Sequence, residues 1–237
     1  MLRIENLTKR YKGGKTAVSD LTLHVEAGDI YGFIGHNGAG KTTTLKCVAG
    51  IHGFDAGSIH INGISVAEQP LACKKQFAYI PDNPDLYEYL TGIQYLNFIA
   101  DIFEISKKDR ELRICQEAEA FELTPALGDL ISSYSHGMKQ KLAIIGALIH
   151  KPKLLILDEP FVGLDPKATL ILKNKMHELC AEGSACFFST HVLDVAEKLC
   201  NKVAIIRQGE LVAAGTVAEL TKGESLEAVF MEVVGNA

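Results

Sequence analysis

Residues 35–42 have the composition and spacing of a phosphate-binding loop. Their sequence is GHNGAGKT, with glycine at the first and sixth positions followed directly by lysine and threonine. Glycines let successive backbone N–H groups turn toward a phosphate, and a following helix presents its positive N-terminal end. Because the strand-like stretch DIYGFI precedes the loop and a helical pattern follows it, we expect a nucleotide site rather than a plain turn.

The loop residues have distinct expected roles. Lys41 should reach the β- and γ-phosphates of the nucleotide, and the Thr42 hydroxyl should bind Mg²⁺. The other members of the nucleotide-binding set are expected to surround the phosphates: Gly35, His36, Asn37, Gly38, Ala39, Gly40 and Thr43. The sequence therefore predicts a nucleoside triphosphate bound together with Mg²⁺.

Two acids close a second apolar run, LLILDEP. Asp158 and Glu159 follow residues typical of a buried parallel strand, so they should lie at the sheet edge where the phosphate loop also ends. Alone, such a pair is typical of a solvated turn. Beside a phosphate loop, we expect Asp158 to hold Mg²⁺, usually through water, and Glu159 to act as general base toward water. The adjacent glutamate favours hydrolysis over phosphoryl transfer to a metabolite.

The elements that must position these residues follow from apolar periodicity. Residues 1–90 begin with short strands and contain the loop and a helix ending near Gly50. Residues 91–150 carry three helical patterns without strand-like runs, which indicates an inserted helical subdomain. Residues 151–237 alternate strand, helix, strand, helix and strand, which predicts an α/β fold whose parallel sheet has helices on both faces.

Composition excludes several classes of protein. The 237 residues are 47% hydrophobic and 22% charged, with a net charge of -5 and no basic block, so nucleic acid is not an expected partner. No apolar run approaches the roughly 18 residues of a spanning helix, and the N-terminus has no signal-like segment. The six cysteines include no Cys-x-x-Cys pair, so we expect all of them to be buried reduced thiols.

Further segments resemble the ATP-binding subunit of an ABC transporter, and the resemblance covers nearly the whole chain. YSHGM at 134–138 resembles the signature sequence of that family, and GLDP at 163–166 resembles its D-loop. Residues 189–216 resemble its switch-histidine segment with a C-terminal hairpin. The resemblance implies a P-loop NTPase with a RecA-like core, an N-terminal antiparallel β subdomain and an inserted α-helical signature subdomain.

The resemblance also implies roles for residues outside the loop. Tyr11 would stack on the adenine of ATP, and His191 would contact the γ-phosphate and position water near the glutamate. Ser135 and Gly137 would meet ATP held by a second ATPase subunit, and Asp165 would link the two sites. Each has a structural alternative: a core aromatic for Tyr11, a core or capping histidine for His191, a helix cap for Ser135 and a turn residue for Asp165.

Two positions depart from the family pattern. His136 replaces the first glycine of the signature, which leaves the roles of Ser135 and Gly137 intact if its side chain points away. Asp82 replaces the glutamine that usually follows this strand; its carboxylate can reach Mg²⁺ but cannot donate a hydrogen bond when ionised. The acidic replacement and GMKQK resemble ATPases of exporters of the ABC-2 or Ecs kind.

The expected function is ATP hydrolysis that powers a membrane exporter. The resemblance implies separate transmembrane permease subunits, docked near residues 82–89, and a homodimer or heterodimer of ATPase subunits at the cytoplasmic face of the membrane. An alternative is an ABC ATPase outside transport, such as one of Fe–S assembly. A metabolite kinase or GTPase is a third class, but it gives no reason for the signature or the switch histidine.

Overall fold

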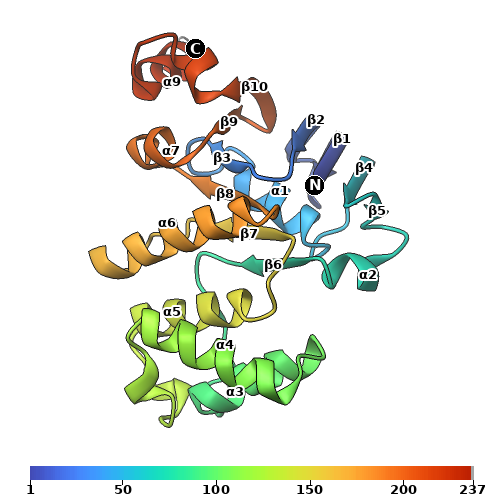
Figure 1. Cartoon of the computed structure of the whole chain (residues 1–237). Helices are drawn as coiled ribbons and strands as arrows, with labels where there is room; N and C mark the ends of the chain where they lie inside the picture. Colours follow the sequence, from blue (N-terminus) through green and yellow to red (C-terminus); the bar gives the residue numbers. More distant parts are fainter. Residues whose placement is uncertain (236–237) are drawn as a thin grey trace.

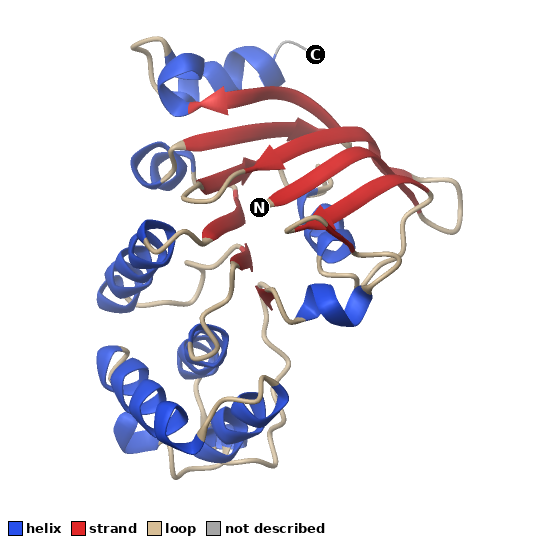
Figure 2. Ribbon diagram, turned by 45° about the vertical axis from the view of Figure 1, so that its right-hand side comes forward, coloured by secondary structure: helices blue, strands red, loops and turns tan. Residues whose placement is uncertain are grey.

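The first sheet is antiparallel and built mainly from the N-terminal quarter of the chain. The computed structural model describes residues 1–235. The sheet has the order β2-β1-β4-β5, and its members are β1 (Leu2–Arg10), β2 (Thr16–Val25), β4 (Ala56–Ile61) and β5 (Ile64–Ser65). Alternate residues of β1 and β2 are buried, which is the pattern of strands with one face against a core. Figure 2 shows the strands gathered on one side of the molecule and most helices on the other.

The second sheet carries the predicted chemistry. Its order is β10-β9-β3-β8-β7-β6, and its members are β3 (Ile30–Ile34), β6 (Phe77–Ile80), β7 (Leu154–Asp158), β8 (Ala185–Thr190), β9 (Lys202–Arg207) and β10 (Glu210–Thr216). All neighbours are parallel except the antiparallel pair β9–β10. Because the chain directions agree, the ends of β3, β7 and β8 meet at one edge of the sheet.

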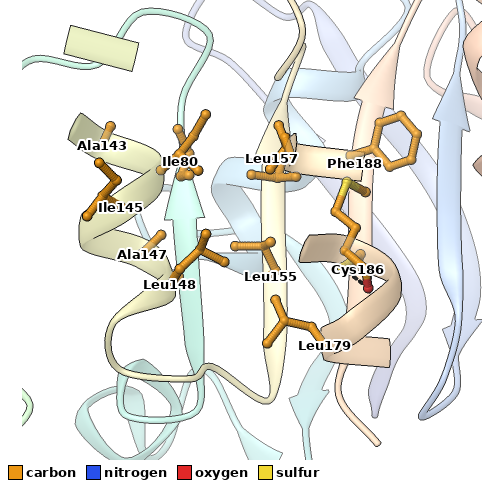
Figure 3. Packing of buried hydrophobic residues seen from close by; sticks show 14 of the residues in the cluster. Ile80, Ala143, Ile145, Ala147, Leu148, Leu155, Leu157, Leu179, Cys186 and Phe188 are labelled. Atoms are coloured by element: carbon orange, nitrogen blue, oxygen red, sulfur yellow. Dashed lines mark hydrogen bonds between the residues drawn. The ribbon is translucent and has the colours of Figure 1, made fainter. Parts of the chain in front are cut away.

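The two faces of this sheet are covered differently. α5 (His136–Leu148), α6 (Pro166–Ala181) and α7 (Leu193–Leu199) cover one face. Figure 3 shows part of that core, where side chains of α5 lie beside Ile80 of β6 and alternate residues of β7, Leu155 and Leu157. α1 (Lys41–Val48) and the antiparallel sheet share the other face. The prediction of helices on both faces was therefore right for one face and incomplete for the other.

The three helices expected within residues 91–150 are present. They are α3 (Gly92–Ile102), α4 (Lys107–Ala120) and α5, and Figure 1 shows them grouped at one end of the molecule. Each begins at a hydroxyl residue whose side chain accepts a backbone N–H, as with the capping box of Thr91 and Gln94. No helix within residues 1–235 is long and apolar enough to cross a membrane. The exact limits of the helical subdomain remain a prediction.

Several local features differ from the expectation. The apolar pattern predicted one strand from residue 202, whereas the resemblance implied a hairpin there. The structure has the hairpin, because Gln208 and Gly209 both take positive φ and turn the chain back. Short helices were not predicted at α2 (Pro70–Lys74), α8 (Val217–Thr221) or α9 (Leu226–Gly235). All six cysteines are free, but Cys115 is exposed on α4, so the prediction of six buried thiols was wrong for that residue.

Candidate active site

The phosphate loop joins β3 to α1 and is held in a tight conformation. Gly40 has a φ of 113°, and a Cβ there would lie 2.5 Å from the carbonyl oxygen of Ala17, so only glycine fits. The Lys41 side chain is 7% exposed, and its Nζ donates to the carbonyl oxygens of Gly35 at 2.6 Å and His36 at 3.3 Å. Burial lowers the pKa of Lys41, whereas Glu159 and Asp158 oppose that shift. The ammonium group therefore lies along the loop, ready to meet a phosphate.

Glu159 lies between a cation and an imidazole. Its Oε1 is 3.6 Å from Lys41 Nζ, and its Oε2 is 3.0 Å from His191 Nδ1. The backbone of Glu159 takes a φ of 48°, unusual for a residue other than glycine, and its N–H donates to Ser189 Oγ at 3.0 Å. The carboxylate is thus held at the mouth of β7, where it could accept a proton from water. His191 follows β8 and is half exposed, so it is not a buried core residue.

Asp158 ends β7 in a buried position. Ser189 Oγ donates to its Oδ1 at 2.5 Å. Burial raises the pKa of the carboxyl, and hydrogen bonds from Ser189 and Thr42 oppose the shift. Its Oδ2 is buried with no well-formed hydrogen bond among residues 1–235. Mg²⁺ prefers oxygen ligands and is usually bound by one or two protein oxygens together with phosphate oxygens and water. The free Oδ2 of Asp158 and the Thr42 hydroxyl provide such oxygens, so these residues fit Mg²⁺.

A cavity of ≈ 270 Å³ collects most of the predicted residues. Its lining comprises Tyr11, Lys15, Ala17, His36, Asn37, Gly38, Gly40, Lys41, Thr42, Thr43, Asp82 and Glu159. The Tyr11 hydroxyl is 3.2 Å from Thr43 Oγ1, and the residue is 39% exposed, so the ring flanks the loop with much of its surface available. Asp82 enters from the loop after β6. The structure thus brings together Tyr11 and Glu159, which lie 148 positions apart in sequence.

The signature residues lie away from this cavity, since neither Ser135 nor Gly137 lines it. Ser135 caps α5 by accepting the N–H of Met138 at 3.3 Å. A Cβ added to Gly163 would lie 2.5 Å from His136 Cδ2, so the His136 ring packs directly on Gly163. The first turn of α5 is therefore attached to the 163–166 turn of its own chain.

Asp165 strengthens that attachment. Its Oδ2 is 2.7 Å from Lys141 Nζ on α5, and its Oδ1 accepts the N–H of Ala168, which makes it the N-cap of α6. The turn-residue alternative for Asp165 is thus correct for the single chain. Any role across a dimer would be additional.

Some site residues were missed at the sequence level. Ser189 Oγ donates to the Asp158 carboxylate and accepts the backbone N–H of Glu159. The hydroxyl residues that end the apolar strand ACFFST were the signal available for it. The Tyr79 hydroxyl is buried and has no hydrogen-bond partner among residues 1–235. Burial raises the pKa of this hydroxyl, and the carboxylates of Asp158 and Asp82 raise it further. No sequence pattern distinguishes Tyr79 from an ordinary strand aromatic. Lys15 and Ala17 enter the cavity through the β1–β2 pairing alone.

An apolar groove of ≈ 440 Å³ lies between β6 and the helices α3 and α5. Its lining includes Pro81, Pro84 and Leu86 from the segment after β6, together with Ile99 and Ala147 from the helices. Tyr87, Tyr89 and Phe98 also expose large parts of their rings in this region. Within residues 82–89, where partner docking is expected, Pro84, Asp85 and Leu86 therefore line the groove.

His150, at the base of this groove, provides a test of pH dependence. Its ring stacks on Phe103 with centroids 3.7 Å apart, and burial lowers its pKa from 6.5 to about 4. Because the fold favours the neutral form, its stability contribution is complete above pH 6.5 and lost as the pH falls toward 4. We expect the free energy of unfolding to drop by on the order of 2–3 kcal/mol over this range through His150.

The variant His150→Phe keeps a stacked ring but cannot be protonated. In chemical denaturation, its stability should fall less than that of the wild type between pH 6.5 and pH 4. His177→Phe, at an exposed position, is the matched control and should follow the wild type. Parallel pH curves for His150→Phe and the wild type would contradict the assignment.

Comparison with known proteins places these features in a family. Residues 18–162 match the family model described as ABC transporter. The chain is 36% identical to the ABC-type transporter ATP-binding protein EcsA of Bacillus subtilis over 98% of this chain and 96% of that protein. It is 34% identical to the linearmycin resistance ATP-binding protein LnrL of the same organism, over 93% of this chain and 70% of that protein. A solved ATP-binding subunit of an ABC transporter superposes with a TM-score of 0.95, at 36% identity, covering 98% of this chain and 99% of that one.

Proposed function

The chain belongs to the ABC transporter family of ATP-binding proteins, and we propose that residues 35–42, Asp158, Glu159 and His191 are the part of it that hydrolyses ATP. As a member, it is the ATP-binding subunit of a transporter and couples ATP hydrolysis to transport. The observation that carries the residue assignment is the Glu159 carboxylate, which lies 3.6 Å from Lys41 Nζ and 3.0 Å from His191 Nδ1. Tyr11 and Asp82 complete the cavity around the same loop.

Hydrolysis requires water to be activated beside the γ-phosphate. In our proposal, Lys41 leaves the carbonyl oxygens of its loop and binds the phosphates, and Glu159 accepts a proton from the attacking water. His191 orients the Glu159 carboxylate through Nδ1 and keeps its other ring nitrogen free for the γ-phosphate. Ser189, on the neighbouring strand, donates to the Asp158 carboxylate and accepts the backbone N–H of Glu159, so the backbone that carries the base is held before the substrate arrives.

The Mg²⁺ assignment concerns Thr42, Asp158 and Asp82. When bound, Mg²⁺ would neutralise charge that develops on the phosphate oxygens. The Thr42 hydroxyl and the free Oδ2 of Asp158 provide the protein oxygens for it, and Asp82 lines the same cavity, from which it could reach the ion through water.

The position of the signature residues supports a sandwiched dimer. Ser135 and Gly137 do not line the nucleotide cavity of their own chain, so a role toward ATP requires a second subunit. Ser135 caps α5, and the N-terminal end of this helix favours an anionic phosphate. We therefore propose that ATP joins two ATPase subunits, as a homodimer or heterodimer, and that hydrolysis weakens their contact.

The partner is proposed to be a separate transmembrane permease. The apolar groove beside residues 82–89 offers it a docking surface, and the exposed Tyr87 and Tyr89 rings would be covered there. We propose that the subunit, docked to such a permease, lies at the cytoplasmic face of the membrane. An exporter is favoured because the relative LnrL is named for resistance to linearmycin.

Replacing Lys41 tests the nucleotide site. Lys41→Ala should weaken ATP binding by about 10- to 100-fold, because a charge-assisted hydrogen bond to phosphate is lost. Isothermal titration with a non-hydrolysable ATP analogue measures this directly. Lys46→Ala, on the same helix but outside the cavity, is the matched control and should bind like the wild type. Unchanged affinity of Lys41→Ala would refute the site.

A further inference from the structure

The C-terminal helix α9 touches the phosphate loop. The ring of Phe230 packs edge-on against the ring of His36, with centroids 4.9 Å apart and planes at 68°. Phe230 is 6% exposed although α9 is the last element described, so its ring is enclosed by the core. α9 also lies outside residues 18–162, which match the family model. A segment about 190 residues downstream of the loop thus forms one side of it.

α9 is held in place by contacts at both of its ends. Leu226 is fully buried, and its N–H donates to Glu197 Oε2 on α7 at 2.8 Å. Near the other end, Arg207 Nη1 at the end of β9 donates to the carbonyl oxygen of Val233 at 3.1 Å. Figure 1 shows α9 beside β9 and β10 at the end of the molecule opposite α3 and α4. These two hydrogen bonds therefore fix the helix that carries Phe230, so the ring is held against His36.

His36 is placed where a change in its position would reach the nucleotide. Its carbonyl oxygen accepts from Lys41 Nζ at 3.3 Å and from the N–H of Ala39 at 3.1 Å, and the residue lines the nucleotide cavity. The loop around it contains Gly35, Gly38 and Gly40, whose backbones are intrinsically free, so its tight conformation depends on contacts with neighbouring elements. A contact that restricts this freedom before ATP binds reduces the entropy lost on binding.

We propose that Phe230 is a positioning residue for ATP, because its contact with His36 holds the phosphate loop in the conformation that binds the phosphates. We call this support of the loop by α9 the brace. The proposal rests on the assignment of residues 35–42 as the nucleotide site. It goes beyond that assignment by giving the C-terminal helix a role in nucleotide affinity. Glu197 of α7 also accepts a hydrogen bond from α9, and α7 begins just after His191. α9 therefore contacts both segments that would face the γ-phosphate, the phosphate loop and the segment that follows His191.

Substitution of Phe230 tests the brace. Phe230→Ala should weaken ATP binding about two- to tenfold, the range for loss of one aromatic pair, with little change in kcat. Met231→Ala, next on the same helix but 60% exposed, is the matched control and should bind ATP like the wild type. Circular dichroism and chemical denaturation report whether α9 remains folded. Phe230→Leu, which retains apolar volume, should fold and still bind ATP more weakly than the wild type.

A double-mutant cycle separates the brace from a general structural effect. His36→Ala and Phe230→Ala should each weaken binding, and the double variant should be little worse than either, because both remove the same contact. Additive effects, or wild-type affinity in both Phe230→Ala and Phe230→Leu, would overturn the brace. Lys41→Ala in the same assay tests the nucleotide site independently: if it loses ATP binding while the Phe230 variants retain it, only the brace is wrong.

Discussion

Glu159→Gln should bind ATP as well as the wild type but hydrolyse it about 10²- to 10⁴-fold more slowly, the range for loss of a general base. Glutamine keeps the size of the side chain, so the positions opposite Lys41 and His191 stay occupied. It cannot accept a proton from water at neutral pH. The removal of one negative charge beside the γ-phosphate also favours retention of bound ATP. A steady-state phosphate-release assay beside a binding titration measures both quantities.

A matched control shows whether the loss of turnover is specific to the position of Glu159. Glu224→Gln makes the same change at an exposed position and should leave turnover unchanged. His191→Ala should lower turnover less than Glu159→Gln does, because Glu159 would keep its proton-accepting carboxylate while losing only its orienting partner. Turnover that persists in Glu159→Gln would exclude Glu159 as the base.

The phosphate loop and the acids were predictable because their chemistry is encoded locally. Gly35 to Thr42 are consecutive, and the geometry that cradles a phosphate depends on their own backbone. Asp158 and Glu159 follow a fully buried strand, and in a parallel sheet such strands end at the same edge. The α/β class followed from the same runs of apolar residues, whereas the RecA-like core with its antiparallel β subdomain was implied by the family resemblance.

The parts that could not be predicted depend on contacts between distant segments. The pairing of Phe230 with His36 joins residues whose local patterns are ordinary, since an amphipathic C-terminal helix has many possible docking sites. The pleat of β8 turns the Ser189 hydroxyl to the Asp158 carboxylate of β7, but the strand order that makes β7 and β8 neighbours is not contained in either strand. The contact of His136 with Gly163 is likewise a property of how α5 meets the 163–166 turn.

The close packing of the first turn of α5 on Gly163 decides which variant best tests the sandwiched dimer. An aspartate at Gly137 would add charge, but a Cβ there lies 2.9 Å from the carbonyl oxygen of Gly163, so the variant would also strain its own chain. Ser135 has no such constraint. Aspartate and asparagine both cap helices about as well as serine does, so either can replace Ser135 without loss of the cap of α5. The two variants then differ in charge alone.

Ser135→Asp should abolish ATP-dependent dimerisation, whereas Ser135→Asn should largely retain it. If Ser135 faces the γ-phosphate held by a second subunit, a carboxylate at this position is repelled by the negative phosphate. This repulsion should weaken the affinity of the dimer by roughly 10²-fold or more. Analytical ultracentrifugation in the Glu159→Gln background, where ATP should persist, reads the dimer fraction. Each monomer should bind ATP as before, because Ser135 does not line its own cavity. Equal dimer fractions in the two variants would show that a charge at Ser135 does not affect dimerisation. Ser135 would then not face the ATP of the second subunit, and another surface would have to cover the nucleotide.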